Sequence, residues 1–213
     1  MNDKYRSMNA DINRSWEITG ALDPVTIKHN LPGCVRVRRA TKSQDLRGVD
    51  FIADLDGGRK VRIDSKPRFG SAKRHWKPHA TGVLVPEIVL ETWSTVPGTN
   101  PLRGEEGTIG WALKTSSVTD YYLFTFDSAD TDRCYLLAAD ELRRAMLDNP
   151  QWPARYKLVR SWTRSDDGTK WQSECVILPI TEVKRACTAA QDWRSARLVS
   201  EDPLVVEPPR RRA

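Results

Sequence analysis

One segment constrains this chain more than any other: residues 49–66, in which two alternating stretches flank a pair of glycines. Apolar residues recur at every second position from Val49 to Leu55, and alternation over this length is typical of a β-strand. The turn Asp56-Gly57-Gly58 supplies backbone that tolerates positive φ, as a tight hairpin requires. The segment is therefore predicted to fold as a β-hairpin.

The second strand of this hairpin gathers charged side chains on one face. Val61 and Ile63 fall on the other face, because successive side chains of a strand point to opposite sides. Asp64 and Lys66 thus share a face, and the adjacent strand can bring Asp50 within their reach. Two carboxylates and a lysine on one sheet face can hold a divalent cation beside a water and a phosphate, as a metal-dependent nuclease requires.

The tripeptide Asp64-Ser65-Lys66 belongs to a pattern, acid-x-lysine, that is short enough to occur by chance. A second match, Glu182-Val183-Lys184, has no hairpin and no upstream acid, so we set it aside. A third strand is predicted over residues 83–93, because its composition favours β-structure. Glu87 and Glu91 share one face of that strand about 13 Å apart, so only one of them can join a single site.

The order of these features is similar to that of a known superfamily. An acid, a hairpin, an Asp-x-Lys and a strand with a glutamate resemble the PD-(D/E)XK nucleases, whose fold is restriction-endonuclease-like. The later stretches resemble a branch in phage and prophage proteins, in which a strand glutamate precedes a Gly-rich turn and a strand opening on Asp-Tyr. The resemblance covers roughly residues 10–145, and its motifs are Asp50, Asp64-Ser65-Lys66, Glu91-Thr92-Trp93-Ser94, Gly107-Thr108-Ile109-Gly110-Trp111, Lys114-Thr115 and Asp120-Tyr121-Tyr122-Leu123.

The resemblance implies a role for each residue of the hairpin motif. Asp50 and Asp64 would bind Mg²⁺, for which Mn²⁺ would substitute, with the backbone carbonyl of Ser65 as a further ligand. Lys66 would orient or activate the attacking water and stabilise the charge that develops on the phosphate. Two departures stand beside the match: Val49 lies where the superfamily commonly has proline, and Ser65 lies where an apolar residue is more usual.

Two glutamates are further candidates for a metal ligand or a general base. They are Glu17, on a helix predicted over residues 3–18, and Glu91. Each acid of the motif also has a plainer interpretation: Asp50 as a turn acid at a strand edge, and Asp64 with Lys66 as a solvated polar face.

Charge favours a polyanionic partner without requiring one. The 34 Lys and Arg exceed the 28 Asp and Glu, for a formal net charge of +6, and a positive excess attracts nucleic acids over long range. A basic cluster follows directly after Lys66, where it could grip a phosphate backbone or form a solvated loop. The candidate DNA contacts are Arg68, Lys73, Arg74, Lys77 and Lys114.

Cysteine spacing gives no sign of a zinc site. Cys34, Cys134, Cys175 and Cys187 include no Cys-x-x-Cys pair and are interpreted as reduced thiols of a cytoplasmic protein, in a bacterium or a phage-infected host. The N-terminal residues lack the apolar stretch of a secretory signal, and no run is long enough for a membrane span. The sequence therefore predicts DNA as the partner, with no membrane, and leaves a homodimer open.

The remaining elements complete the expected fold. Pro67, with no N–H to donate, is expected to end the pairing of the second hairpin strand. The other predictions are strands over 34–38, 120–126 and 134–138, a short crossover helix over 109–116, a helix over 140–147, a second hairpin over 157–163 and 170–178 around an Asp-Asp-Gly turn, and a helix over 181–190.

We therefore expect an α/β (α+β) fold with a restriction-endonuclease-like αβββαβ core, whose mixed central sheet is flanked by helices. Residues 1–148 would form this nuclease core, 149–202 a β-hairpin and helix that extend the same domain, and 203–213 a disordered basic tail. The function implied is a metal-dependent deoxyribonuclease of phage or mobile-element DNA processing.

Two alternatives stay open. The chain could be a catalytically inactive nucleic-acid- or protein-binding module that retains the nuclease fold. It could instead be an unrelated α+β protein whose hairpin mimics the motif, and that hypothesis predicts that the carboxylates of Asp50 and Asp64 lie too far apart to share one ion.

Overall fold

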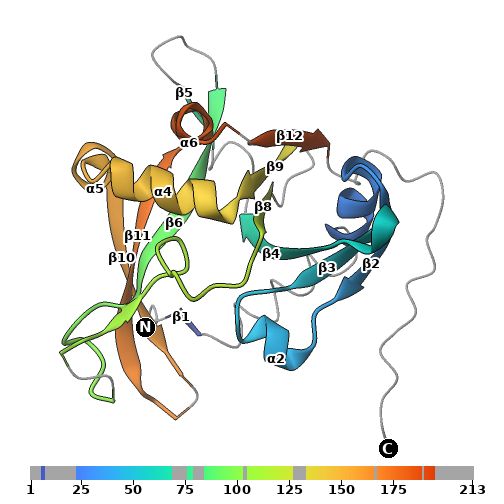
Figure 1. The fold of residues 1–213 in the computed structure, drawn as a ribbon. Coiled ribbons are helices and arrows are strands. Elements are labelled where there is room, and N and C mark those ends of the chain that lie inside the picture. The colour runs from blue at the N-terminus through green and yellow to red at the C-terminus, as the bar shows by residue number, and fades with distance from the viewer. Residues whose placement is uncertain are drawn as a thin grey trace, which may run out of the picture.

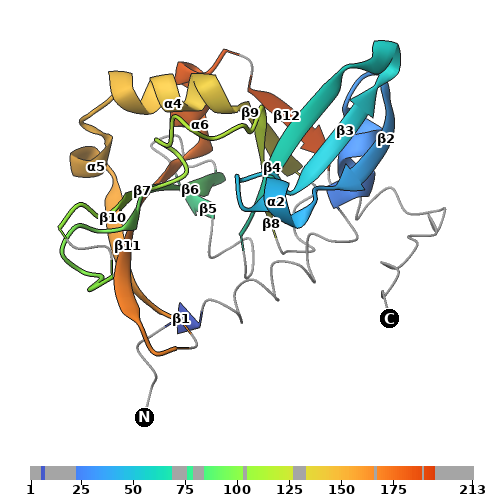
Figure 2. The same cartoon turned by 60° about the horizontal axis from the view of Figure 1, so that its bottom comes forward.

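Two β-sheets and a small number of helices make up the part of the chain that the structure, a computed structural model, describes (Figure 1). The fold is thus a mixture of α and β elements. Figure 2 shows the two sheets side by side, with the helices α4 (Ala139–Asp148) and α6 (Ile180–Ala186) against them. The described residues are 6–7, 23–68, 76–78, 84–102, 105–126, 133–165, 167–188 and 190–194.

The predicted hairpin is confirmed and lies within a six-stranded sheet. Its strands β3 (Phe51–Leu55) and β4 (Lys60–Arg68) pair antiparallel. The 3-10 turn Asp56–Gly58 joins them, and Gly57 and Gly58 have φ of 73° and 80°. The sheet order is β12-β9-β8-β4-β3-β2, in which only β4 and β8 run parallel. Its other strands are β2 (Cys34–Arg39), β8 (Tyr121–Phe126), β9 (Arg133–Ala138) and β12 (Gln191–Arg194).

One face of the hairpin packs into the core, although Ile52 of the opposite face is buried too. Phe51, Ala53, Val61 and Ile63 are buried and pack with the helix of residues 23–30. Asp120 anchors the start of β8 beside β4, since its carboxylate accepts hydrogen bonds from the Arg62 backbone N–H at 2.8 Å and from the Arg62 guanidinium at 2.6 and 3.0 Å. These bonds fix the register in which the motif strand pairs with β8.

The strand predicted over residues 83–93 exists, but it belongs to the other sheet. β6 (Leu84–Thr95) pairs with β11 (Lys170–Pro179), β5 (Trp76–Pro78) and β7 (Thr108–Ile109). β11 in turn pairs with β10 (Lys157–Arg164) in the predicted second hairpin. β10 also pairs, in parallel, with β1 (Arg6–Ser7). The hairpin of residues 157–179 is therefore joined to the middle of the chain through β6.

The main core lies between the two sheets and beneath the helices. Ile88 and Leu90 of β6 and Tyr122 and Phe124 of β8 belong to the same buried cluster as Leu142 of α4. Besides α4 and α6, short helices lie at Lys42–Asp45 (α2) and Trp152–Arg155 (α5). Within the described ranges, no helix combines the length and the apolar character that a membrane span needs.

Several local predictions were wrong. Residues 109–116 form no crossover helix but a strand end followed by turns, because Gly110 lies so close to β6 that a Cβ there would be 2.3 Å from the Glu91 carbonyl oxygen. Pro67 does not end the pairing: it lies opposite Thr125 of β8, beyond the part of β4 that β3 covers.

The two ends of the chain also differ from expectation where the structure describes them. Arg6–Ser7 is a strand and not part of a helix, and the other residues of the helix predicted over 3–18 lie outside the described ranges. The helix expected over 181–190 ends at Ala186, and the chain then turns into β12. Residues 203–213 also lie outside the described ranges.

Candidate active site

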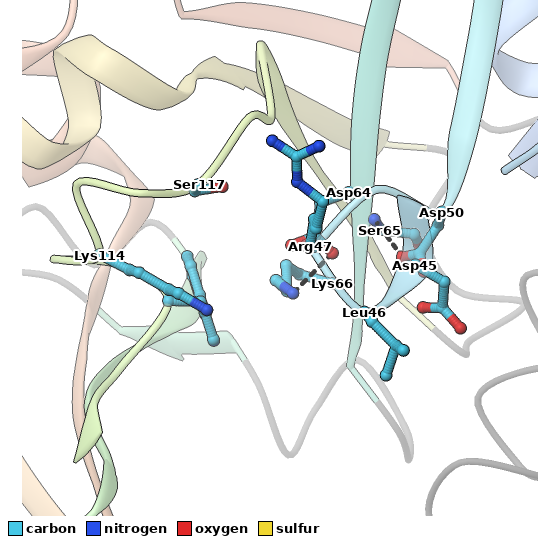
Figure 3. A pocket seen from close by; sticks show the side chains of 11 residues that line it. Asp45, Leu46, Arg47, Asp50, Asp64, Ser65, Lys66, Lys114 and Ser117 are labelled. Carbon is cyan, nitrogen blue, oxygen red and sulfur yellow. Dashed lines mark hydrogen bonds and ion pairs between the residues drawn. The ribbon is translucent and has the colours of Figure 1, made fainter. Parts of the chain in front are cut away.

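The hairpin motif lines an open cleft of about 390 Å³ (Figure 3). One wall consists of β4 and the turn that follows α2, and the other of the loop between β7 and β8. Lys114 projects from this loop toward Lys66 (Figure 3). The lining residues are Asp45, Leu46, Arg47, Gly48, Asp50, Asp64, Ser65, Lys66, Trp111, Lys114 and Ser117.

The two acids of the motif face each other across the strand pair. The backbone N–H of Asp50 donates to the Ile63 carbonyl at 2.9 Å, which fixes Asp50 beside the start of the motif. Its carboxylate accepts the Ser65 backbone N–H at 2.7 Å. Asp50 is near enough to Asp64 for its charge to raise the pKa of that carboxyl. This proximity weighs against the separated carboxylates that the mimic hypothesis predicted.

Lys66 and Asp64 form an ion pair in which the Asp64 carboxylate is largely buried and the Lys66 side chain is 23% exposed to the cleft. The Lys66 Nζ lies 2.6 Å from Asp64 Oδ1, and the Asp64 side chain is only 6% exposed. Burial raises the pKa of Asp64 to about 7, with Lys66 opposing the shift and Asp50 adding to it. Burial would lower the pKa of Lys66, but the charges of Asp64 and Asp50 outweigh it and leave that pKa raised. Lys66 is therefore an ammonium at neutral pH.

Ser65 connects the motif to an acid that the sequence did not single out. Its hydroxyl donates to Asp23 Oδ2 at 2.5 Å, and Asp23 is only 2% exposed at the start of the helix of residues 23–30. Asp45 is a second acid missed at the sequence level. It lies in the cleft wall, and burial and the Asp50 charge raise its pKa. Both acids come from short helices whose position relative to the hairpin depends on tertiary packing.

The donor set fits a hard divalent cation. Among the described residues, no three His, Cys, Asp or Glu side chains converge closely enough to hold a metal ion by themselves. Mg²⁺ does not need such a set, since one or two carboxylates, a carbonyl, waters and substrate phosphate commonly complete its shell. Gly48 leaves space beside the acids, because a Cβ there would lie 3.6 Å from Asp64 Oδ2. Asp50, Asp64 and the Ser65 carbonyl are the groups that would hold the ion.

Glu91 does not line the cleft. Its Oε2 accepts the Ser94 hydroxyl at 2.6 Å and the Trp111 backbone N–H at 3.3 Å. Through the second contact Glu91 holds the loop that carries Trp111, which does line the cleft. Glu17 lies outside the described residues.

This geometry gives opposite expectations for two substitutions of Glu91. Glu91→Gln keeps an amide oxygen that can accept both hydrogen bonds, whereas Glu91→Ala removes the acceptor. Under the nuclease hypothesis we expect cleavage rates within about threefold of wild type for Glu91→Gln and about tenfold lower for Glu91→Ala. Steady-state cleavage assays of both variants would test this. A Glu91→Gln variant as inactive as Glu91→Ala would instead indicate a metal ligand or a general base.

The structure describes only some of the side chains that are predicted to contact DNA. Lys114 lies in the cleft wall, and the exposed Arg47 lies in the opposite wall although the sequence did not single it out. For Arg68 and Lys77 the structure describes the backbone alone, within β4 and β5. Lys73 and Arg74 lie outside the described ranges. None of the four cysteines, all within the described ranges, forms a disulfide.

The raised pKa of Asp64 predicts that a divalent cation and a proton compete for this carboxylate. A folded-state pKa of about 7 lies above the usual carboxyl range, so the folded protein takes up a proton here as the pH falls below 7. We expect apparent Mg²⁺ or Ca²⁺ affinity to rise with pH, by up to about tenfold per unit, and to level off above pH 7. Titration calorimetry between pH 5.5 and 8.5 measures this, and a flat profile would contradict it.

Comparisons of this chain with family models, with curated proteins and with solved structures give no match.

Proposed function

We propose that this protein is a metal-dependent deoxyribonuclease with a restriction-endonuclease-like core, which processes phage or mobile-element DNA. The observation that carries the proposal is the cleft itself. Asp50, Asp64 and Lys66, separated in sequence by a hairpin, meet in one open cleft whose walls also carry Arg47 and Lys114. A binding module has no need for two acids that face the position of a phosphate.

The topology supports the proposed core. The strands β2, β3 and β4 form an antiparallel meander, and β8 joins β4 in parallel, so a mixed sheet carries the motif strand at its centre. The crossover from β4 to β8 departs from the expected αβββαβ order, because β5, β6 and β7 take the place of a crossover helix. The sheet order supports the proposed core, and the resemblance in sequence supports the phage-type branch.

Each polar group of the cleft has a role in the proposed reaction. A bound divalent cation would polarise the scissile phosphate and lower the pKa of a water. Asp50 and Asp64 provide the negative charge that attracts such a cation. The Lys66 ammonium stabilises charge that develops on the phosphate, as a preorganised cation in a partly desolvated site does. Arg47 and Lys114 contact neighbouring phosphates of the same strand or its complement.

A cleavage assay tests the proposal directly. Wild-type protein is incubated with plasmid, linear and branched DNA, each with Mg²⁺, with Mn²⁺ and with EDTA. We expect cutting that requires the metal, and the DNA form that is cut defines the type of nuclease. DNA binding without cutting on any of these substrates would instead favour the inactive binding module.

A further inference from the structure

The ammonium of Lys66 has aromatic neighbours as well as a carboxylate. Its Nζ lies 4.8 Å from the centroid of the Trp111 ring and 5.8 Å from that of Tyr122. Asp64 Oδ1 lies 2.6 Å from the same nitrogen. A cation within about 6 Å of an aromatic face is attracted by the ring quadrupole, most strongly by tryptophan and most strongly where water is excluded. Lys66 therefore has two kinds of partner in the cleft.

Trp111 is held rigidly by both sheets. Its ring packs on Tyr122, with centroids 4.7 Å apart, and on Phe124 at 6.2 Å, both from β8. The backbone carbonyl of Trp111 accepts the Tyr122 hydroxyl at 3.0 Å, and the backbone N–H of Trp111 donates to the Glu91 carboxylate of β6. Gly110 permits this approach, since any side chain there would clash with the β6 backbone. The ring is thus packed between Lys66 and the aromatic side chains of β8.

We propose that Trp111 is a positioning residue: it holds the Lys66 ammonium in the cleft when a metal cation replaces that ammonium beside Asp64. This inference rests on the proposed function. A cation held by Asp50 and Asp64 would repel the Lys66 ammonium from its carboxylate partner. Without a second partner, the flexible lysine stem would disperse among many rotamers. The tryptophan face offers that partner and keeps the charge beside the scissile phosphate.

Because Trp111 lines the cleft, its ring could instead stack on a nucleobase. The two roles differ in what they change. Base stacking contributes to DNA affinity, so its loss raises Kd and KM. Positioning of Lys66 acts on the chemical step, so its loss lowers kcat and leaves Kd unchanged.

The test compares Trp111→Leu with Trp111→Phe in the full chain, each alone and combined with Lys66→Met. We expect Trp111→Leu to lower kcat about tenfold and Trp111→Phe less than about threefold, with DNA Kd unchanged. In the Lys66→Met background, Trp111→Leu should have no further effect, because the two residues act as a unit. An equal loss in both backgrounds, a rise in Kd with kcat retained, or no loss at all would each overturn the inference.

Fluorinated tryptophan provides a measurement that does not depend on the folding of Trp111→Leu. Fluorine withdraws electron density from the ring and weakens cation binding while nearly preserving its shape. Incorporation should lower kcat of the wild type but not of Trp111→Phe, whose other tryptophans carry the same fluorine. Equal sensitivity of both proteins would count against the inference. Absence of metal-dependent cleavage by the wild type would remove the proposed function itself, whereas wild-type cleavage that is indifferent to Trp111 would remove this inference alone.

Discussion

Asp64→Asn should abolish metal binding and DNA cleavage together. The substitution keeps the size of a side chain that is only 6% exposed but removes the negative charge that attracts the cation. Loss of metal-assisted catalysis removes several kcal/mol of transition-state stabilisation, so we expect cleavage to fall by at least about a hundredfold. Calorimetric titration with Ca²⁺ and cleavage assays with Mg²⁺ on the same preparation would measure both losses.

Asp54→Asn is the matched control for this experiment. Asp54 belongs to the same hairpin, and its Oδ2 lies 3.8 Å from Arg38 Nε. Asp54 does not line the cleft. We expect Asp54→Asn to retain metal binding and cleavage. If Asp64→Asn cleaved DNA at the wild-type rate, either the site would be misassigned or the activity would come from another protein.

Lys66→Met should separate binding from chemistry. Methionine fills the space of the lysine stem but carries no charge, so the phosphate loses a fixed cation and cleavage should fall by about a hundredfold to a thousandfold. Metal binding should remain, since the ammonium at 2.6 Å no longer competes for Asp64. Lys66 lowers the pKa of Asp64, so its removal lets the Asp64 carboxyl retain its proton to higher pH. Metal binding by Lys66→Met is therefore best measured at pH 8.5.

Lys60→Met controls for the loss of a positive charge from the same strand. Lys60 is exposed at the start of β4 and lies outside the cleft. Its substitution should leave cleavage and metal affinity unchanged. Loss of metal binding in Lys66→Met would show that this lysine organises the acids and is not a group that acts on the phosphate alone.

The motif hairpin could be predicted from sequence because its determinants are local. Strand parity placed Asp64 and Lys66 on one face, and the turn glycines have the positive φ that the sequence implied. β8, β9 and α4 were also predictable from short windows of sequence. β8 and β9 are continuous apolar runs whose consecutive residues are buried, and α4 buries residues at helical spacing.

The other wall of the cleft could not be derived in this way. β6 was predicted as a strand, but its place in the second sheet is set by pairing with β11, which lies far along the chain. Trp111 reaches Lys66 only because Gly110 lies against β6 and Tyr122 holds the loop from β8. Such contacts depend on three segments at once, and no window of sequence contains them. Asp23 was missed for the same reason, since helix packing brings it to Ser65.

The interleaving of the two sheets has a consequence for how the chain folds. β4 and β8 are parallel neighbours at the centre of one sheet, yet β5, β6 and β7 lie between them in sequence and belong to the other. β6 in turn pairs with β11, which lies far along the chain. β9 pairs with β12, which comes near the end of the described chain. Contacts of such long sequence separation slow folding, because loop entropy is lost before the contacts form. On the ribosome, the cleft would therefore assemble only after most of the chain has emerged.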